Sequence, residues 1–303
     1  MPDQATKLRE LIASGSAELV AGAPGAPGVP MIVVASGRAG VGATTVAVNL
    51  AAVLADQGER VVVVDAAQRA PLVAEAAGAS LAVARSLCDV LSGASPAAEA
   101  LAPGPVGTLL LAHRAGARPH VDVSRKSQQR LFGELNKLRN EASVLVVDVG
   151  SGLTPWTQRF WARARHVVLV TTTGDLALMD TYALLKRASA QRLWADVRVL
   201  ANQCENDVVA RDVHGRLSGA CQRFLSQDVH ALPWLPRHLA DVRDRAVFPR
   251  VWESPTSPFG QAALWLGRAV SELLAVEQSK NAGAGDGPAR SAIRAGWHAG
   301  LKK

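Results

Sequence analysis

Short apolar runs alternate with amphipathic stretches along most of the 303-residue chain. A continuous apolar run of about four to eight residues is typical of a strand that is buried on both faces. Such runs predict strands at Met31–Ala35, Arg60–Asp65, Thr108–Ala112, Ser143–Asp148, His166–Thr171 and Val197–Asn202. Helical patterns follow or separate them at Thr45–Ala55, Arg125–Asn140, Leu176–Leu193 and Gln261–Val276. This alternation predicts an α/β fold with a doubly wound, mostly parallel sheet of about 6–8 strands and helices on both faces.

Glycine-rich stretches set off both ends of this predicted sheet domain. Residues 1–14 carry a helical pattern, and residues 15–30 have the Gly/Pro/Ala composition of a flexible linker. Residues 31–278 hold the predicted strands and helices. A second linker at 279–288 precedes a basic, helix-like segment at 289–303. We therefore expect one α/β domain with a tethered helix at each end.

Composition and charge narrow the class of protein. The chain is 49% hydrophobic and 19% charged, which supports a buried core and excludes a disordered or fibrous protein. No apolar run reaches the roughly 20 residues that span a membrane, and the N-terminus lacks an apolar signal region, so we expect a cytoplasmic protein. More than half of the net charge of +7 lies from Lys280 onward, which indicates a basic tail more than a basic globular surface.

The cysteines give no sign of a metal cluster or a disulfide framework. The chain has three, Cys88, Cys204 and Cys221, and no C-x-x-C pair. We interpret them as small buried hydrophobic residues in a reducing compartment.

The first predicted strand leads into a glycine-rich loop, Gly37-Arg38-Ala39-Gly40-Val41-Gly42-Ala43-Thr44-Thr45, and then into a helix. A phosphate-binding P-loop has the pattern G-x-x-x-x-G-K-[ST] between a strand and a helix. Its glycines let backbone N–H groups surround phosphate oxygens, and the helix N-terminus adds a partial positive charge. Gly37, Gly42 and Thr44 match this pattern, with the Thr44 hydroxyl available to Mg²⁺, whereas Ala43 replaces the lysine. The loop therefore predicts a P-loop fold with one essential side chain missing.

The alanine at position 43 affects both hydrolysis and affinity. The lysine of a P-loop reaches the β- and γ-phosphates and offsets charge as the phosphoryl group moves. Removing one preorganised charge or donor of this kind lowers a rate on the order of a hundred- to thousand-fold. We expect ATP and Mg²⁺ to bind more weakly than in an intact site, and the sequence is also compatible with no ATP binding.

The loop resembles the deviant Walker A motif of the MinD/ParA family of P-loop ATPases, K-G-G-x-G-K-[ST]-T. In that family a signature lysine crosses a dimer interface to the partner's nucleotide, and here Arg38 occupies its position while Ala39 replaces a glycine. Arginine keeps the charge but not the shape of lysine, so Arg38 either compensates in part for Ala43 or is a solvated surface residue. The resemblance implies nucleotide contacts from the whole loop and from Asp65, Asp148, Gly150 and Asn202.

Other family positions are partly kept and extend the resemblance from Met31 to about Val276. The family has Asp-x-Asp after its second strand, and the second carboxylate, which positions the attacking water, is Ala67 here. The run Asp148–Gly152 resembles the Walker B and switch II segment D-x-G-x-G, and Asp148 with Thr44 would hold Mg²⁺. Asn202 resembles the asparagine that binds adenine, and Asp180–Lys186 resembles the family helix D-A-Y-A-x-[IL]-K.

The first residues resemble a second motif. Asp3-Gln-Ala-Thr-Lys-Leu-Arg9 is similar to D-Q-A-x-x-L-R at the N-terminus of the FlhG family, MinD-like regulators of flagellar number and placement. There the segment docks on FlhF, a GTPase of the signal-recognition-particle (SRP) type, and stimulates it. By resemblance Gln4 would reach the partner's active site, with Asp3, Leu8 and Arg9 placing it. A terminal helix without a role is the alternative.

The last residues carry an apolar stripe between basic side chains. Ile293, Trp297 and Leu301 recur every four residues beside Arg290, Arg294, Lys302 and Lys303. Such a helix suits the surface of an anionic inner membrane, and MinD and FlhG carry a membrane-targeting helix at this end. Gly296 and Gly300 weaken it, and a disordered basic tail is the alternative.

Three functions are compatible with these patterns. The first is a regulator of flagella or another polar machine that binds an SRP-type GTPase and has lost ATP hydrolysis, because Ala43 and Ala67 leave two catalytic positions empty. The second is an active MinD/ParA-type ATPase of division or partition in which Arg38 replaces the lysine. The third is a nucleic-acid partition protein, which the pI of about 9.8 favours but which lacks a helix-turn-helix or a basic aromatic groove. The chain would be a monomer, a homodimer, or a heterodimer with an intact relative.

Overall fold

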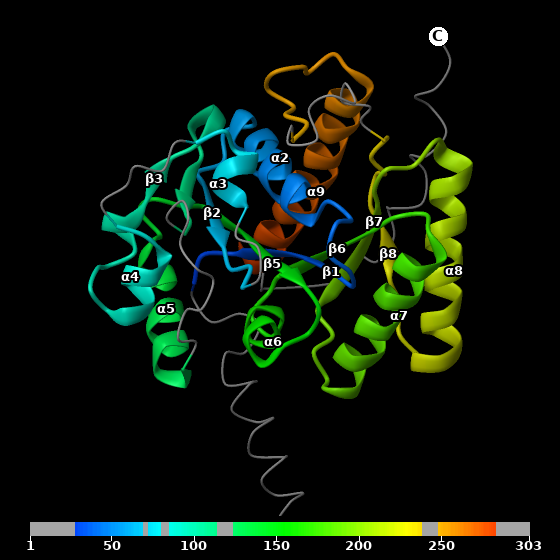
Figure 1. Cartoon of the computed structure of the whole chain (residues 1–303), viewed down its shortest axis with the longest axis horizontal. Helices are drawn as coiled ribbons and strands as arrows, with labels where there is room; N and C mark the ends of the chain where they lie inside the picture. Colours follow the sequence, from blue (N-terminus) through cyan, green and yellow to red (C-terminus); the bar gives the residue numbers. More distant parts are fainter. Residues whose placement is uncertain (1–27, 69–71, 80–84, 114–123, 238–247, 283–303) are drawn as a thin grey trace, which may run out of the picture. The chain divides into compact units, whose positions relative to one another are not determined.

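Eight strands form one sheet in the computed structural model, which describes residues 28–68, 72–79, 85–113, 124–237 and 248–282. Their order across the sheet is β3-β4-β2-β5-β1-β6-β7-β8, with labels as in Figure 1. Neighbouring strands are parallel except β3 and β4, which are antiparallel. The strands are β1 (Met31–Ser36), β2 (Val61–Asp65), β3 (Ala102–Pro103), β4 (Leu109–Leu111), β5 (Val144–Ser151), β6 (His166–Thr171), β7 (Asp196–Ala201) and β8 (His230–Ala231).

The predicted fold class is confirmed, and all six predicted strands are present as β1, β2, β4, β5, β6 and β7. The sequence analysis did not identify β3 and β8, which form the two edges of the sheet. Each has only two residues, so neither is long enough to show a periodic pattern. The edge strands therefore come from tertiary pairing more than from local sequence.

Helices cover both faces of the sheet. Figure 1 shows α2 on one side and α5, α6 and α7 on the other, with α8 beside α7. The helices are α2 (Ala43–Asp56), α3 (Val73–Ala76), α4 (Leu87–Ser92), α5 (Arg125–Lys137), α6 (Pro155–Trp161), α7 (Asp175–Ala190), α8 (Asp207–Leu225) and α9 (Pro258–Ala282), with 3-10 turns at η1 (Ala98–Ala100) and η2 (Pro105–Gly107). The predicted helices correspond to α2, α5, α7 and α9. The sequence analysis did not single out α8.

The central strands are apolar along their whole length because both of their faces are covered. Every residue of β1 and β2 is buried, and so are the first six of β5. A buried valine or leucine side chain contributes about 1.5–3 kcal/mol relative to an exposed one, so these strands carry much of the core. Ser36 and Asp65, which end β1 and β2, are buried as well, and so is Asp148 within β5, so polar groups are buried toward the carboxyl edge of the sheet.

Helix α9 extends further than its predicted range. The chain divides into two compact units, and the boundary falls within α9, between Ala269 and Val270. In the first unit Gly267 packs against Val53 of α2, where any Cβ would overlap the valine side chain. The helix continues to Ala282, into the predicted linker at 279–288, because alanine favours helix and the first glycine of that linker is Gly283.

Both predicted terminal helices lie outside the described residues. They hold the docking motif of Asp3, Gln4, Leu8 and Arg9 and the apolar stripe of Ile293, Trp297 and Leu301. None of the helices in the described part of the chain combines the length and the apolarity that a membrane span requires.

Candidate functional site

The parallel sheet brings the candidate residues together at its carboxyl edge. Strand β1 ends at Ser36 and the glycine-rich loop follows. Strand β2 ends at Asp65, which is in register with Asp148 of β5. Open α/β sheets bind ligands at this edge, where the strand order reverses. Here β1 lies between β5 and β6, so the loop starts at the centre of the sheet.

The loop has the backbone conformation of a phosphate cradle. Gly40 and Gly42 have φ values of 83° and 93°, a region that side chains disfavour. Gly42 is the N-cap of α2, so the first N–H groups of the helix face the loop. A Cβ on Gly37 would lie 2.5 Å from the backbone of Asp180, which explains a glycine at the loop entrance. The conformation of the loop thus depends on positive φ values and on close packing that only glycine permits.

Thr44 and Asp148 form the metal side of the site. The Thr44 hydroxyl donates to Oδ2 of Asp148 at 2.5 Å, and the Gly150 N–H donates to Oδ1 at 3.0 Å. Burial raises the pKa of Asp148, and these two hydrogen bonds oppose that rise. A hydroxyl next to a buried carboxylate is the oxygen donor set that Mg²⁺ takes at a P-loop, so these residues fit the ion.

Asp65 is a second buried carboxylate next to the first. It accepts backbone N–H groups from Ala67 at 3.3 Å and from Val73 at 3.2 Å. Burial, followed by the charge of Asp148, raises its pKa well above the ordinary value. Two buried acids at neighbouring strand ends favour a cation or a proton between them. Two buried carboxylates side by side destabilise the fold when both are charged, so a purely structural role does not explain them.

The two positions where the family carries catalytic side chains are buried alanines. Ala43 is 8% exposed in the first turn of α2, and Ala67 is 3% exposed after β2. A Cβ on Gly150 would lie 3.3 Å from the Cβ of Ala67, so the segment after β2 lies against the end of β5 here. The Trp156 indole of α6 holds the same segment by donating to the carbonyl of Ala66 at 2.7 Å. Methyl groups therefore occupy both positions in a packed environment.

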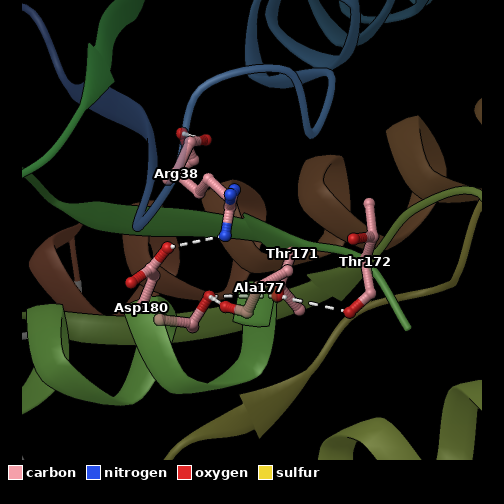
Figure 2. Close-up of polar contacts among 7 residues, drawn as sticks. Arg38, Thr171, Thr172, Ala177 and Asp180 are labelled. Carbon is pink, nitrogen blue, oxygen red and sulfur yellow. Dashed lines mark hydrogen bonds and ion pairs between the residues drawn. The ribbon is translucent and has the colours of Figure 1, made fainter. Parts of the chain in front are cut away.

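Arg38 forms an ion pair within its own chain. Figure 2 shows its guanidinium directed at the carboxylate of Asp180 on α7, with an N–O distance of 3.3 Å. Both side chains are nearly half exposed, at 46% and 47%. Asp180 is held in place because its neighbour Thr181 donates to Thr171 of β6 at 3.0 Å. The resemblance did not predict this contact.

Asn202 lies at the end of β7 and touches the loop directly. Its Nδ2 donates to the carbonyl of Val41 at 2.8 Å, and its Oδ1 accepts from the N–H of Gln203 at 2.9 Å. A Cβ on Gly42 would overlap this amide. The side chain predicted to bind adenine thus also fixes the shape of the phosphate loop.

Two further groups near this edge were not predicted from the sequence. Asn49 of α2 binds the backbone of Pro249 at 2.8 Å and of Val251 at 2.7 Å, which ties the segment before α9 to the helix that follows the loop. Buried His113, one residue beyond Ala112, contacts Cys88 at 3.5 Å. No local motif marks either contact, because the partners are distant in sequence.

The predicted burial of the cysteines is confirmed for two of the three residues. Cys204 and Cys221 are buried, and burial raises the pKa of each thiol to about 11. Cys88 of α4 is only half-buried, and its Sγ contacts Nδ1 of His113. In the described part of the chain, no three His, Cys, Asp or Glu side chains are grouped to hold a metal ion.

The strand, glycine loop and helix, with Thr44 beside Asp148, define a P-loop NTPase fold. A family model described as an AAA domain matches residues 29–193. The antiactivator FleN of Pseudomonas aeruginosa is 30% identical over 80% of this chain and 94% of its own length. The flagellum site-determining protein YlxH of Helicobacter pylori is 25% identical over 76% of this chain and 78% of its own length.

A solved structure agrees in fold. The septum site-determining protein MinD of Pyrococcus horikoshii, complexed with Mg-ADP, superposes with a TM-score of 0.65 at 20% identity, covering 82% of this chain and 98% of that one. The chain belongs to the MinD/ParA family of P-loop proteins and is most like its FlhG-type members.

Proposed function

We propose that this chain is a MinD-like regulator of the placement or number of flagella, or of another polar machine, that acts by binding partner proteins and hydrolyses ATP slowly or not at all. The observation that carries the proposal is the pair of buried alanines, Ala43 and Ala67, beside an intact Thr44–Asp148 contact. The relatives FleN and YlxH, named as an antiactivator and a flagellum site-determining protein, support the regulatory part.

The residues present fit a nucleotide and Mg²⁺ in part. Backbone N–H groups of the loop and the first turn of α2 would hold the phosphates, and Thr44 with Asp148 would hold the ion. A bound Mg²⁺ neutralises phosphate charge. Ala43 supplies neither charge nor donor, so the chain's own groups orient the nucleotide without a lysine. The alanine should therefore lower the affinity for the nucleotide more than the selectivity among nucleotides.

The proposal is tested by calorimetry with ATP and Mg²⁺ on the wild type and on Ala43→Lys, together with ATP turnover. We expect weak or undetectable binding by the wild type, tighter binding by the variant, and negligible wild-type turnover. Ala190→Lys places the same charge on the exposed last residue of α7, outside the loop, and serves as the control. Wild-type turnover at the level of an intact family ATPase would contradict the loss of hydrolysis and favour the ATPase in which Arg38 replaces the lysine.

The partner that we infer for the N-terminal arm is an SRP-type GTPase, FlhF or a protein like it. The support is the motif of Asp3, Gln4, Leu8 and Arg9 on a glycine-rich tether, which suits docking of a short helix. The full chain should raise the GTP turnover of such a partner, and Gln4→Ala should abolish the stimulation. Lys7→Ala, which changes the arm at a position that the motif leaves variable, should keep the stimulation. Equal stimulation by all three proteins would refute the role of Gln4.

A second inferred contact is peripheral binding of the C-terminal segment to an anionic inner membrane from the cytoplasm. The apolar stripe through Trp297 between basic side chains supports it. The full chain should sediment with vesicles that contain phosphatidylglycerol, and Trp297→Glu should prevent this. His298→Glu adds the same charge off the stripe and should have a smaller effect. Binding that is unchanged in Trp297→Glu would show that only the charge of the tail matters.

A further inference from the structure

Cys88 and His113 place a thiol against an imidazole ring, here called the Cys88–His113 pair. The Sγ of Cys88 lies 3.5 Å from Nδ1 of His113. The backbone supports this approach, because the N–H of Leu87 donates to the carbonyl of Ala112 at 3.0 Å, and each of these two residues directly precedes a member of the pair. The start of α4 and the segment after β4 are therefore held together at this point.

The three thiols of the chain lie in different environments. Cys204 and Cys221 are buried, and burial raises the pKa of each thiol to about 11, so both stay protonated at neutral pH. Cys88 is only half-buried, so a small reagent can reach its sulfur. Because the thiolate is the form that reacts, a base beside an accessible thiol makes it a better nucleophile.

His113 is placed to act as this base. The residue is 6% exposed, and burial lowers the pKa of its imidazole, so the ring is neutral at pH 7 and can accept a proton. The ring also hydrogen-bonds to the backbone of Asp65, which favours the protonated form. An imidazolium at this position would therefore face a thiolate and a polar backbone group.

The charged side chains around the pair have bonds of their own. Helix α5 packs on α4, and β2 pairs with β4, which precedes His113. The bonds on these elements and beside them join Asp89 to Ser86, Arg85 to Glu99, Arg130 to the carbonyl of Leu91, Glu134 to Lys137, and Asp65 to the N–H groups of Ala67 and Val73. A substitution of His113 leaves the partners of these bonds in place.

We propose that Cys88 is a modification site at which hydrogen peroxide oxidises the thiol, with His113 as the proton acceptor. The thiol proton passes to Nδ1 of His113, and the sulfur attacks one peroxide oxygen as the O–O bond breaks. The leaving hydroxide takes the proton from His113 and departs as water. The sulfur is thereby oxidised to a sulfenic acid, the peroxide is reduced, and the neutral ring is restored. Neither side chain takes part in the proposed nucleotide or partner contacts, so this site is independent of the proposed function.

The test measures sulfenic acid formation at each cysteine of the full chain, by dimedone trapping and peptide mass spectrometry after treatment with hydrogen peroxide. At pH 7, Cys88 should react at least about tenfold faster than the thiol of glutathione and about a hundredfold or more faster than Cys204 and Cys221. The glutathione thiol is fully exposed, so exposure alone cannot explain a faster reaction. A Cys88 rate at or below that of glutathione would overturn the proposal, and this comparison needs no substitution.

His113→Gln tests the base directly. At pH 7 the variant should slow the oxidation of Cys88 by about tenfold or more. At pH 10 most of an ordinary thiol ionises without a base, so wild type and variant should react within about twofold of each other. His214→Gln removes another half-buried histidine, on α8, and should leave the Cys88 rate unchanged. A rate that His113→Gln leaves unchanged at pH 7, or lowers equally at both pH values, would leave His113 no role as a base and would overturn the proposal.

Discussion

The carboxyl and amino ends of the parallel strands place carboxylates in opposite electrostatic environments. We call these two ends the carboxyl edge and the amino edge. At the carboxyl edge Asp65 and Asp148 are buried next to each other, and burial raises the pKa of both. At the amino edge of β6 and β7, Asp196 accepts from His166 at 2.7 Å and from Arg198 at 2.9 Å. Burial alone would raise the pKa of Asp196, but these partners outweigh it and the pKa is lowered. The carboxyl edge is therefore electrostatically unfavourable without a ligand, whereas the carboxylate at the amino edge already has partners for its charge.

This contrast shows which parts of the phosphate site the fold itself maintains. The Thr44–Asp148 bond and the Asn202–Val41 bond also hold the loop to the sheet, so losing them would weaken the fold. A lysine at 43 would serve nucleotide binding and hydrolysis, and an aspartate at 67 would serve hydrolysis, whereas the fold accommodates a buried alanine at both positions. Hydrolysis can therefore be lost while the scaffold persists.

The largest expected effect comes from refilling both emptied positions. Ala43→Lys with Ala67→Asp should raise ATP turnover on the order of a hundred- to thousand-fold over the wild type, because a charge at the phosphates and a carboxylate for the attacking water return together. Steady-state phosphate release measures this. Ala43→Lys with Ala67→Asn keeps the size and removes the charge.

The control variant decides how to interpret the result. Turnover in the aspartate variant that exceeds the asparagine variant supports two separate losses on one reaction. Equal turnover would show that position 67 does not act in hydrolysis, and would break the contrast between a kept scaffold and a lost catalytic pair.

Gly42→Ala should damage the scaffold of the carboxyl edge. Its φ of 93° disfavours a side chain, and the new methyl would displace the Asn202 amide from Val41, so we expect a loss of about 2–4 kcal/mol in the free energy of unfolding. Gly58→Ala has a similar φ of 95° with open space around it and should lose only about 1–2 kcal/mol. Urea unfolding compares them, and equal losses would mean that Asn202 does not support the loop.

The sequence predicted the sheet because its central strands are buried on both faces and long enough to show it. It also predicted the phosphate loop, since glycine spacing reports backbone geometry directly. It did not predict the Arg38–Asp180 pair, the Asn49 contacts to Pro249 and Val251, or the packing of Arg163 on the Phe132 ring. Those depend on how distant helices pack, and no local period encodes that arrangement.

The pH dependence of the free energy of unfolding should have opposite signs for the carboxylates of the two edges. The folded pKa of Asp196 lies below that of the unfolded chain, so its contribution to stability is present above about pH 4 and is lost as the pH falls through the folded pKa. Asp196→Asn should lower the free energy of unfolding at pH 7 by about 1–3 kcal/mol and flatten this acid loss. The folded pKa of Asp65 lies above that of the unfolded chain, so the contribution of Asp65 to the free energy of unfolding instead falls as the pH rises. Urea unfolding from pH 3 to pH 8 measures both, and an unchanged acid slope in Asp196→Asn would show that the amino edge is not stabilised by this pair.

The smallest effect on stability should come from Arg38, and it bears most directly on the alternative function. The Arg38–Asp180 pair is nearly half exposed, so Arg38→Ala should change the free energy of unfolding by less than about 1 kcal/mol. If Arg38 instead replaces the missing lysine, the same variant should reduce nucleotide affinity or turnover by tenfold or more, because a charge at the phosphates is lost. Asp180→Ala frees the guanidinium and serves as the matched variant. It should raise nucleotide affinity if the pair restrains Arg38, and leave it unchanged if Arg38 is only a surface residue. Calorimetry with ATP on the three proteins, beside their unfolding curves, distinguishes a retained cation of the phosphate site from an exposed ion pair on α7.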